Sequence, residues 1–373
     1  MRRTAIRTHS AAVVLAALAL TACDRSPTPL AAPARELNVY SWSDFFAPDV
    51  LADFEKESGI RVNLVIFPSQ EALEATLLTG HSGYDVAVVA SSALSRLKRA
   101  HVFRELDRSK LSNWSNLDPE VMARLATDDA ENHYAVAYDW GTTAIAFNVA
   151  KIRQLAPDAP LDSWRLVLDP GVISRYAACG VSIVDAPSEL VAVALIANGQ
   201  NPNTTDAAEI AAAGRRLMAI RPYVRKIDGD MQIADLASGD VCLMVTWPSN
   251  FVIARRRAAE AGSHDVFRYV IPAEGTLSWA DTLAIPADAP HVLEAHAFIN
   301  YLMRADIAAR GANFLGNASA NQAALPRIEK LLRDDPSIYP PPEARRALQP
   351  LHSRPDAANR SVTRIWTHFR TGH

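Results

Sequence analysis

Glycine is scarce in this sequence, and the shortage removes several classes of nucleotide-binding protein. It accounts for 15 of the 373 residues, which is below the usual share. Neither a GxGxxG nor a GxxxxGK[ST] stretch occurs, and these are the glycine-rich turns that let a backbone approach phosphate groups closely. We therefore expect no nucleotide cofactor bound through such a loop.

Motifs that mark common catalytic and metal centres are missing as well. The ten histidines are scattered, no HExxH occurs, and His291 and His296 are five residues apart, which places them on different faces of a helix. No GxSxG turn is present. The sequence thus predicts no catalytic residues, no metal site and no cofactor. An enzyme whose residues assemble only on folding is the less favoured alternative.

Positive charge is in short supply once the start of the chain is set aside. The formal net charge is −3. Residues 1–22 contain three arginines and no acids, so the chain without them carries −6. Binding to nucleic acid requires a basic face, so we exclude nucleic acid as a partner.

The first residues have the layout of a bacterial lipoprotein signal. Arg2, Arg3 and Arg7 precede an apolar run over residues 11–20 that is short for a membrane span. Leu20-Thr21-Ala22-Cys23 resembles a lipobox, in which the cysteine is lipidated and becomes the first mature residue. We expect a signal peptide over 1–22, a membrane anchor at Cys23 facing the periplasm, and a proline-rich tether over 23–35. An ordinary cleavage site that leaves Cys23 as a thiol is the alternative.

Two cysteines remain after Cys23, namely Cys179 and Cys242. Export would place them in an oxidising compartment, where an even number of cysteines indicates a disulfide. Two buried free thiols are the alternative that the count alone leaves open.

Strands and helices alternate along the first part of the folded chain. Predicted strands cover 37–41, 61–67 and 84–89, and predicted helices run from Pro48 to Gly59 and over 71–78. Such alternation is typical of a largely parallel sheet with helices on both faces.

A second α/β unit is expected further along the chain. Two extended segments surround Gly141-Thr142-Thr143, a candidate crossing point between the units. The helix near 291–304 should direct Leu293, Phe298, Ile299 and Leu302 inward. The remaining predicted elements are extended segments at 134–138 and 144–148, a helix over 206–220, a strand over 241–246, a helix after Pro248, and strands over 267–271 and 282–285.

Two short stretches, Trp42-Ser43-Asp44 and Trp279-Ala280-Asp281, each place an indole two residues from a carboxylate. An indole face attracts an ammonium ion and a carboxylate accepts its N–H donors. A core ring beside a helix-capping aspartate is the alternative. Trp42, Asp44, Trp247 and Asp281 are all predicted at or just after a strand's carboxyl end, where α/β sheets bind ligands. A shared cleft is therefore expected.

Several longer stretches together carry a family resemblance. The chain resembles the periplasmic polyamine-binding proteins of ABC importers, which bind putrescine or spermidine and belong to family 1 of the bacterial extracellular solute-binding proteins. The stretches are Leu37 to Phe46, Gly80 to Asp85, Leu106 to Leu111, Trp140 to Thr143, Cys179 to Ser182, Ile285 to Ala289, Ile338 to Pro341 and Arg364 to Thr367.

The resemblance implies an α/β protein with the type II periplasmic binding protein fold. Each of its two lobes would hold a mostly parallel sheet flanked by helices, with the ligand cleft between the lobes. By position, the first lobe comprises 36–140 and about 279–312, and the second comprises 141–278 and about 313–373. The resemblance also implies that Cys179 and Cys242 form a disulfide.

The resemblance further implies which residues bind the ligand. Rings would cover the methylene chain of the amine and carboxylates would hold its ammonium ends. The positions that match the family site are Trp42, Ser43, Asp44, Glu189, Trp247, Asn250, Trp279, Asp281 and Asn317.

Two of these positions depart from the family pattern. Asn250 stands where a carboxylate is expected, and Asn317 stands where a tyrosine is expected. Asp139, Asp228 or Asp230 could replace the lost charge, although solvated loop acids are the plainer interpretation of all three.

The predicted function is that of a monomeric receptor that captures a polyamine and delivers it to the permease subunits of an ABC transporter. A binding protein or sensor for another amine or a zwitterionic solute is the alternative, and Asn250 and Asn317 motivate it.

Overall fold

A computed structural model describes residues 35–229 and 231–372 of the chain. The predicted signal peptide, Cys23, all of the tether except Arg35, and Asp230 lie outside these residues. Within the described part, no helix is both long and apolar enough to span a membrane.

The described strands join into one sheet, whose main path runs in the order β2-β1-β3-β9-β4-β7-β5-β6. Three further strands pair off this path: β10 and β8 pair with β4, and β11 pairs with β9. The strands are β1 (Arg35–Ser41), β2 (Ile60–Ile66), β3 (Val86–Ala90), β4 (Ala135–Asn148), β5 (Val181–Ile183), β6 (Lys226–Ile227), β7 (Leu243–Thr246), β8 (Phe267–Val270), β9 (Thr276–Ala284), β10 (Ala318–Ser319) and β11 (Leu348–Pro350).

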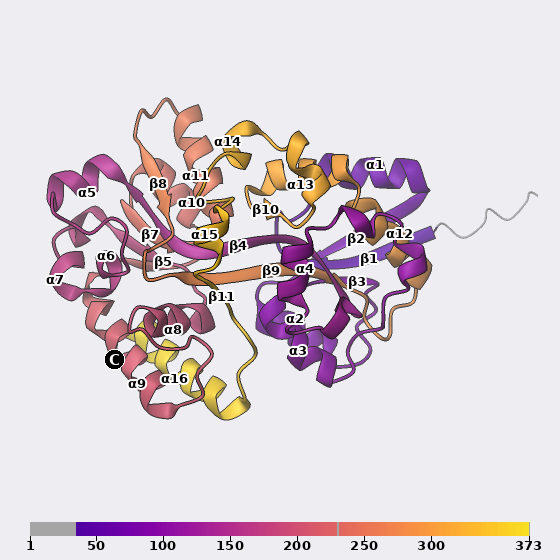
Figure 1. Cartoon of the computed structure of the whole chain (residues 1–373), viewed down its shortest axis with the longest axis horizontal. Helices are drawn as coiled ribbons and strands as arrows, with labels where there is room; N and C mark the ends of the chain where they lie inside the picture. The colour runs from indigo at the N-terminus through magenta and orange to yellow at the C-terminus, as the bar shows by residue number, and fades with distance from the viewer. Residues whose placement is uncertain (1–34, 230, 373) are drawn as a thin grey trace, which may run out of the picture. The chain divides into compact units, whose positions relative to one another are not determined.

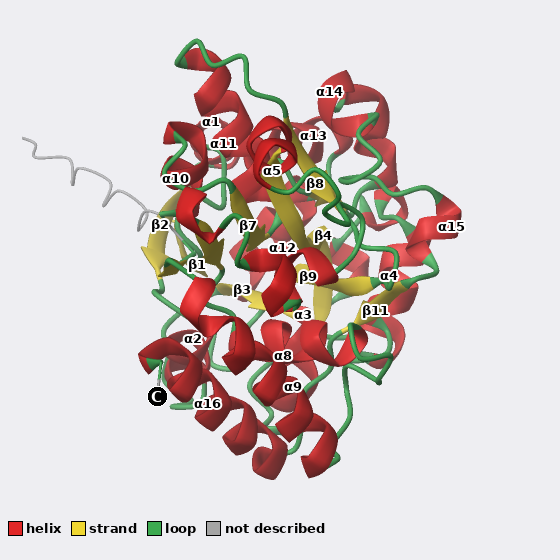
Figure 2. Ribbon diagram, turned by 90° about the vertical axis from the view of Figure 1, so that its left-hand side faces the viewer, coloured by secondary structure: helices red, strands yellow, loops and turns green. Residues whose placement is uncertain are grey.

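Helices cover the sheet on both sides (Figure 1; Figure 2 shows the same layers edge-on). The α-helices are α1 (Pro48–Ser58), α2 (Gln70–Leu77), α3 (Ser91–Arg99), α4 (Pro119–Leu125), α5 (Val149–Leu155), α6 (Arg165–Leu168), α7 (Pro170–Ile173), α8 (Pro187–Ile196), α9 (Ala207–Ile220), α10 (Gln232–Ser238), α11 (Pro248–Glu260), α12 (Val292–Leu302), α13 (Ala305–Leu315), α14 (Lys330–Arg333), α15 (Pro342–Arg345) and α16 (Asp356–Thr371). Short 3-10 helices are η1 (Arg108–Lys110), η2 (Trp114–Asn116), η3 (Ala130–Asn132), η4 (Ala177–Cys179), η5 (Arg221–Tyr223) and η6 (Gln322–Arg327).

Parallel pairing dominates the two ends of the main sheet path and antiparallel pairing its middle, although β11 also pairs parallel with β9. The outer strands are parallel, with β2, β1 and β3 at one end and β6, β5 and β7 at the other. The long strands β4 and β9 lie between them and pair antiparallel with each other and with β7 and β3, respectively. Figure 1 shows β4 and β9 crossing the middle of the described chain. The two α/β ends are therefore joined by these crossing strands.

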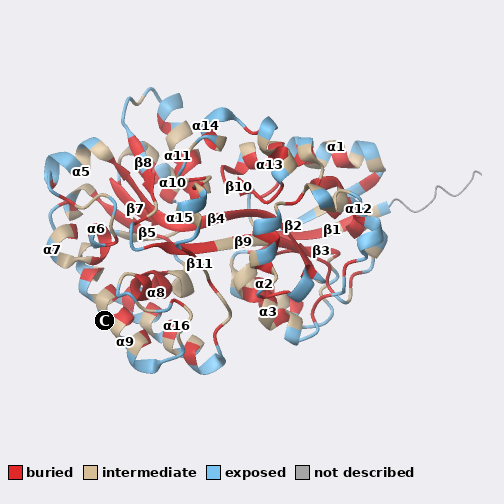
Figure 3. Cartoon of the chain, in the orientation of Figure 1, coloured by how far each residue is buried: buried red, intermediate tan, exposed pale blue. Residues whose placement is uncertain are grey.

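Two separate hydrophobic clusters fill the interior, and the strands between the helix layers are mostly buried (Figure 3). The first cluster includes Leu37, Val88 and Phe298. The second includes Trp164 and Phe369, so α16 returns to the half that holds α8 and α9. A single hydrophobic core stops growing beyond a certain chain length, so a chain of this length forms two cores. The lobe boundaries set out above remain a prediction.

The helix ends and strands predicted from local sequence patterns are correct near the start of the folded chain. Pro48 opens α1 at a first-turn position, Val50 and Phe54 are buried, and the helix ends before Gly59. A proline at this position is tolerated because its missing N–H would have no helical partner. The predicted strands at 37–41 and 61–67 are confirmed as β1 and β2.

Two expectations about the crossing segments are wrong. The extended segments predicted on either side of Gly141-Thr142-Thr143 form one continuous strand, β4. Trp279 and Asp281 do not follow a strand end, because they lie inside β9, which begins at Thr276. The sequence signal was weak in both places, since antiparallel pairing with a buried neighbour decides where these strands extend.

One helix face was also misplaced. In α12 the side chains of Phe298, Ile299 and Leu302 are buried as expected, but Leu293 is 63% exposed. A step of five residues turns a helix by about 140°, so Leu293 and Phe298 cannot share one face.

Candidate ligand-binding site

One face of the β4–β9 pair gathers acidic and aromatic side chains. Asp139 lies opposite Asp281 and Gly141 lies opposite Trp279 in the antiparallel register. Because side chains alternate across a strand, these four positions and Thr143 face the same side of the sheet. The two halves of this surface come from segments far apart in the sequence.

Gly141 is needed where the Trp279 ring crosses β4. A Cβ atom at position 141 would lie 2.6 Å from Cζ2 of Trp279 and 3.2 Å from Cδ of Pro248. A strand normally loses stability at a glycine, but here any larger residue would displace the indole. The absence of a side chain at Gly141 thus lets the Trp279 ring lie close against the strand.

Glu189 reaches the same face from α8. Its carboxylate accepts hydrogen bonds from Oγ1 of Thr143 in β4 and, at 2.9 Å, from Nε1 of Trp247. Trp247 is the residue that follows β7 and precedes α11, as expected from the sequence. The acid and the indole therefore hold each other in place.

Asp139 is tied to the loop that precedes β10. Its Oδ2 accepts a hydrogen bond of 2.7 Å from Nδ2 of Asn317, while Oδ1 of Asn317 accepts one of 3.0 Å from the backbone N–H of Ser249. Asn317 takes this position because α13 ends at Gly316, whose φ of 82° is left-handed. A buried amide thus links Asp139 to the first turn of α11.

Burial raises the pKa of each of the three carboxyl groups on this face. Loss of water raises the pKa of Asp139 well above its usual range, and the charge of Asp281 raises it further. Burial raises the pKa of Glu189, against hydrogen bonds from Thr143 and Trp247. Burial raises the pKa of Asp281 to about 7, with a hydrogen bond from the Trp42 side chain acting in the opposite direction and the charge of Glu189 adding to the rise.

Trp42 completes the group from the carboxyl end of β1. Its ring packs edge-on against Phe67, with ring centroids 4.3 Å apart, and its side chain interacts with Asp281. The structure therefore brings seven of the nine predicted site residues into one region. They are Trp42, Glu189, Trp247, Asn250, Trp279, Asp281 and Asn317.

The other two positions differ in their surroundings. Ser43 and Asp44 follow Trp42 in the turn before α1 and both are exposed. Asp44 has a left-handed backbone with φ of 50°, which an aspartate tolerates better than most residues. Their part in ligand binding stays a prediction.

Asn250 is held as a hydrogen-bond donor. Its Nδ2 donates to the carbonyl oxygen of Gly229 at 3.0 Å and to Oε1 of Gln232 at 3.3 Å. The side chain is 8% exposed. The amide thus fits oxygen acceptors that would repel a carboxylate.

None of the three site carboxylates has a cationic partner. Among the ion pairs of residues 35–229 and 231–372, none includes Asp139, Glu189 or Asp281. No group of histidine, cysteine or acidic residues in the described chain has metal-binding geometry. Buried acids without protein cations are suited to an organic cation.

A cavity lies beside Trp140, Ser278 and Ala280, whose side chains are on the opposite face of β4 and β9, and Trp279 also lines it. Its two acids are paired within the protein: Glu120 with Arg124 at 2.7 Å and Arg345 at 2.9 Å, and Asp128 with His352 at 3.0 Å. The guanidinium of Arg345 also lies 5.5 Å from the Trp140 ring centroid. This cavity therefore has no unbalanced charge to offer a ligand.

A family model described as bacterial extracellular solute-binding protein matches residues 49–339. The chain belongs to this family. Members are binding proteins found outside the cytoplasm, so the chain is a solute-binding protein rather than an enzyme.

Relatives with known ligands are similar over nearly the whole solute-binding protein. A putrescine/agmatine-binding protein of Pseudomonas aeruginosa is 41% identical over 90% of this chain and 92% of its own. A putrescine-binding periplasmic protein of Escherichia coli is 41% identical over 92% and 93%. These similarities confirm the resemblance drawn from the sequence.

Solved structures confirm the two-lobed fold. A protein of a spermidine/putrescine ABC transporter from Listeria monocytogenes superposes with a TM-score of 0.81 at 29% identity, covering 91% of this chain and all of that one. A lipoprotein of Treponema pallidum superposes with a TM-score of 0.76 at 25% identity, covering 90% and 99%.

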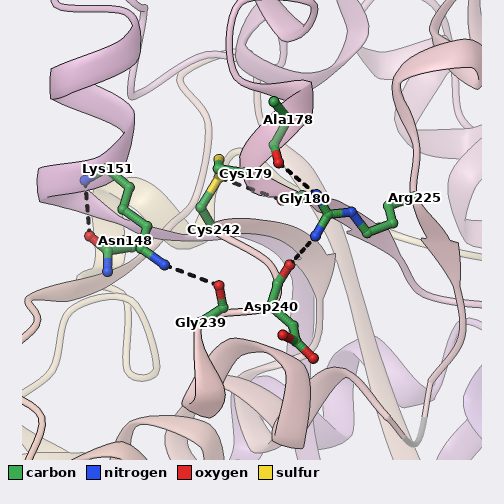
Figure 4. Close-up of a disulfide and its surroundings, with 9 residues drawn as sticks. All are labelled: Asn148, Lys151, Ala178, Cys179, Gly180, Arg225, Gly239, Asp240 and Cys242. Carbon is green, nitrogen blue, oxygen red and sulfur yellow. Dashed lines mark hydrogen bonds between the residues drawn. A yellow bond between two sulfur atoms is a disulfide. The ribbon is translucent and has the colours of Figure 1, made fainter.

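The predicted disulfide of this solute-binding protein is present. Cys179, at the end of η4, is bonded to Cys242, just before β7, and their Cα atoms are 5.6 Å apart (Figure 4). The Arg225 guanidinium lies beside the bridge and donates to the carbonyl oxygens of Ala178 and Asp240 at 2.6 and 2.5 Å. The bridge closes a loop of 63 residues and could stabilise the fold by about 4 kcal/mol in the chain-entropy treatment.

Sequence reasoning undervalued two side chains of the site. Asp139 was expected to be a solvated loop acid, yet it is 2% exposed and faces Asp281. Thr143 was placed only at a crossing point, yet it holds Glu189. A correct boundary for β4 would have placed both on the face that carries Gly141.

Proposed function

We propose that this protein captures a linear cationic amine of the putrescine or spermidine class and delivers it to the permease of an ABC transporter. The observation that carries the proposal is a set of three buried carboxyl groups that form no ion pair within the described chain. They belong to Asp139, Glu189 and Asp281. An ammonium ion supplies the charge that the protein omits.

The surrounding rings suit the remainder of such a ligand. A polyamine consists of apolar methylene segments between charged ends, and Trp42, Trp247 and Trp279 present indole surfaces beside the acids. Each ring can add about 0.5–2 kcal/mol of cation–π attraction. The 41% identical relatives named for putrescine and agmatine support this ligand class.

The ligand would also explain how the two halves cooperate. Glu189 and Trp247 belong to the half with the second core, whereas Trp42 belongs to the half with the first. A cation that contacts both would stabilise a closed arrangement by differential binding. The closed receptor would then dock on its permease as a monomer.

Calorimetric titration of the purified protein tests the proposal. The panel contains putrescine, cadaverine, agmatine and spermidine, with butylamine and 4-aminobutyrate as compounds of similar length and lower positive charge. We expect at least one diamine or polyamine to bind at least about tenfold more tightly than both controls, because each desolvated acid requires a cation. No binding by any polyamine, or tightest binding by 4-aminobutyrate, would overturn it.

We also propose that residues 1–22 are removed as a signal peptide and that lipidated Cys23 anchors the protein on the periplasmic side of a bacterial membrane. The tether over 23–35 would give the folded part reach from the membrane. Replacing Cys23 with serine should move the protein from the membrane fraction to the soluble periplasmic fraction. An unchanged membrane fraction would contradict the anchor.

A further inference from the structure

The surroundings of position 250 leave no place for a negative charge. Nδ2 of Asn250 donates to two oxygen atoms, the carbonyl of Gly229 and Oε1 of Gln232. Oε1 of Gln232 also accepts a hydrogen bond from Thr246, and Nε2 of Gln232 donates to Ser182 and to the Val245 carbonyl. Gln232 is therefore fixed with its oxygen toward Asn250. A carboxylate at 250 would face two acceptors.

Asp139, in strand β4, provides an acid in place of the one that is missing at position 250. It is 2% exposed and stands opposite Asp281 in the β4–β9 register. Its Oδ2 accepts from Asn317, while its Oδ1 is buried and has no hydrogen-bond partner in the part of the chain that the structure describes. A buried carboxylate oxygen without a partner is costly in a folded protein, so this atom indicates an unassigned contact.

The donor that holds Asp139 is itself fixed. Asn317 receives the backbone N–H of Ser249 on its oxygen, so its amide nitrogen must face Asp139. Ser249 precedes Asn250 in the first turn of α11. The two residues that depart from the family pattern are therefore linked through Ser249. The surroundings of Asn250 exclude a negative charge, and Asn317 orients the carboxyl group of Asp139.

We propose that Asp139 is a further ligand-binding residue, which joins Asp281 in holding one ammonium end of the amine and replaces the acid that is missing at position 250. The inference rests on the proposed function and adds the residue that balances the charge of one end. Oδ1 of Asp139 accepts the N–H donor, and Oδ2 stays with Asn317.

The groups around Asp139 support this assignment. The acids Asp281 and Glu189 lie on or reach this face, and the hydroxyls of Tyr138 and Tyr339 lie near Asp139. Through residues 35–229 and 231–372, no lysine, arginine or histidine forms an ion pair with Asp139. Without an ammonium ion, protons must therefore neutralise the site, and a bound amine displaces them.

The replacement Asp139→Asn provides a direct test. Asparagine keeps the size of the side chain and can still accept from Asn317, but it carries no charge. Asp265→Asn, in the exposed turn between α11 and β8, removes the same formal charge away from the site. By calorimetry near neutral pH, we expect Asp139→Asn to weaken putrescine at least about tenfold and Asp265→Asn to change it by less than about twofold.

Proton release separates a ligand contact from a purely structural role. Titrations in two buffers with different ionisation enthalpies count the protons that leave on binding. The unaltered protein should release more protons than Asp139→Asn at mildly acidic pH, because the variant has one fewer acid to deprotonate. Asn250→Asp should fail to tighten binding and should lower the melting temperature.

The outcomes distinguish this inference from the proposed function. Unchanged affinity and unchanged proton release in a folded Asp139→Asn protein would overturn the inference and leave the amine receptor intact. Failure of the unaltered protein to bind any amine would overturn both. If Asp139→Asn does not fold, an amine-bound crystal structure decides: a ligand nitrogen within about 3.2 Å of Oδ1 supports the contact, and a longer separation contradicts it.

Discussion

The two faces of the β4–β9 pair handle negative charge in opposite ways. On one face, Asp139 and Asp281 stand side by side with no ion pair in the described chain, and their pKa values are raised. On the other, Glu120 lies between two arginines and Asp128 lies 3.0 Å from Nδ1 of His352. Burial raises the pKa of Glu120, but the hydrogen bonds and charges of Arg345 and Arg124 outweigh burial and lower it overall.

The difference shows on which face the protein balances its own negative charges and on which face it does not. Paired acids on the Trp140 face need nothing from outside and contribute modestly to stability. Unpaired acids on the Trp279 face destabilise the ligand-free protein when they are charged, and the cation that we propose would remove that cost. The face with unbalanced charge, rather than the face with the cavity, is therefore the one that we propose binds the ligand.

Removing an acid from the unpaired face should have the largest effect. We expect Asp281→Asn to weaken putrescine by about 2–3 kcal/mol, or roughly 30- to 150-fold, because an ammonium end loses its partner. Calorimetric titration measures the change. An affinity that stays within about twofold would remove Asp281 from the site.

Removing a ring should have the next largest effect. Trp247→Ala deletes an indole face and the hydrogen bond that orients Glu189, so we expect a loss of about 1.5 kcal/mol, or roughly tenfold. Trp114→Ala is the matched control, because that half-buried ring lies under the Arg108 guanidinium at 3.3 Å. Equal losses in both variants would contradict a specific role for Trp247.

Acidification should weaken binding by protonating the unpaired acids. With the pKa of Asp281 at about 7, affinity should fall about tenfold from about pH 8 to about pH 6, since protons compete with the amine. The folded state holds this proton more tightly than the unfolded chain. The ligand-free protein should therefore lose stability as pH rises from about 4 to about 7.

Thermal unfolding with and without putrescine checks the predicted direction of both pH effects, on affinity and on the stability of the ligand-free protein. The shift in melting temperature caused by the ligand should be larger at about pH 8 than at about pH 5.5. A shift that is independent of pH would show that no acid with a raised pKa contacts the ligand.

Neutralising an acid on the paired face should have the smallest effect. Glu120→Gln breaks two partly exposed ion pairs, so we expect a loss of at most about 1 kcal/mol in unfolding free energy and less than about twofold in putrescine affinity. Denaturant titration and calorimetry measure these quantities. A large loss of affinity would erase the distinction between the faces.

Features that depend on neighbouring residues were predictable from the sequence. Pro48 and Gly59 bracket α1, and Trp247 follows its strand as expected. The disulfide and the family were also predicted correctly, since both rest on stretches that a resemblance preserves. The error at Leu293 came from assigning it to the helix face of Phe298, although five residues turn a helix by about 140°.

The amino-acid sequence by itself determined most helices and strands, the α/β class and the kinds of side chain available for an organic cation, because these follow from local periodicity and composition. The two-lobed arrangement was implied by the family resemblance. Only the tertiary structure decided that Asp139 meets Asp281, that Glu189 joins them and that Asn250 serves as a donor. Those facts depend on antiparallel register and on loss of water, and both arise when distant strands pair.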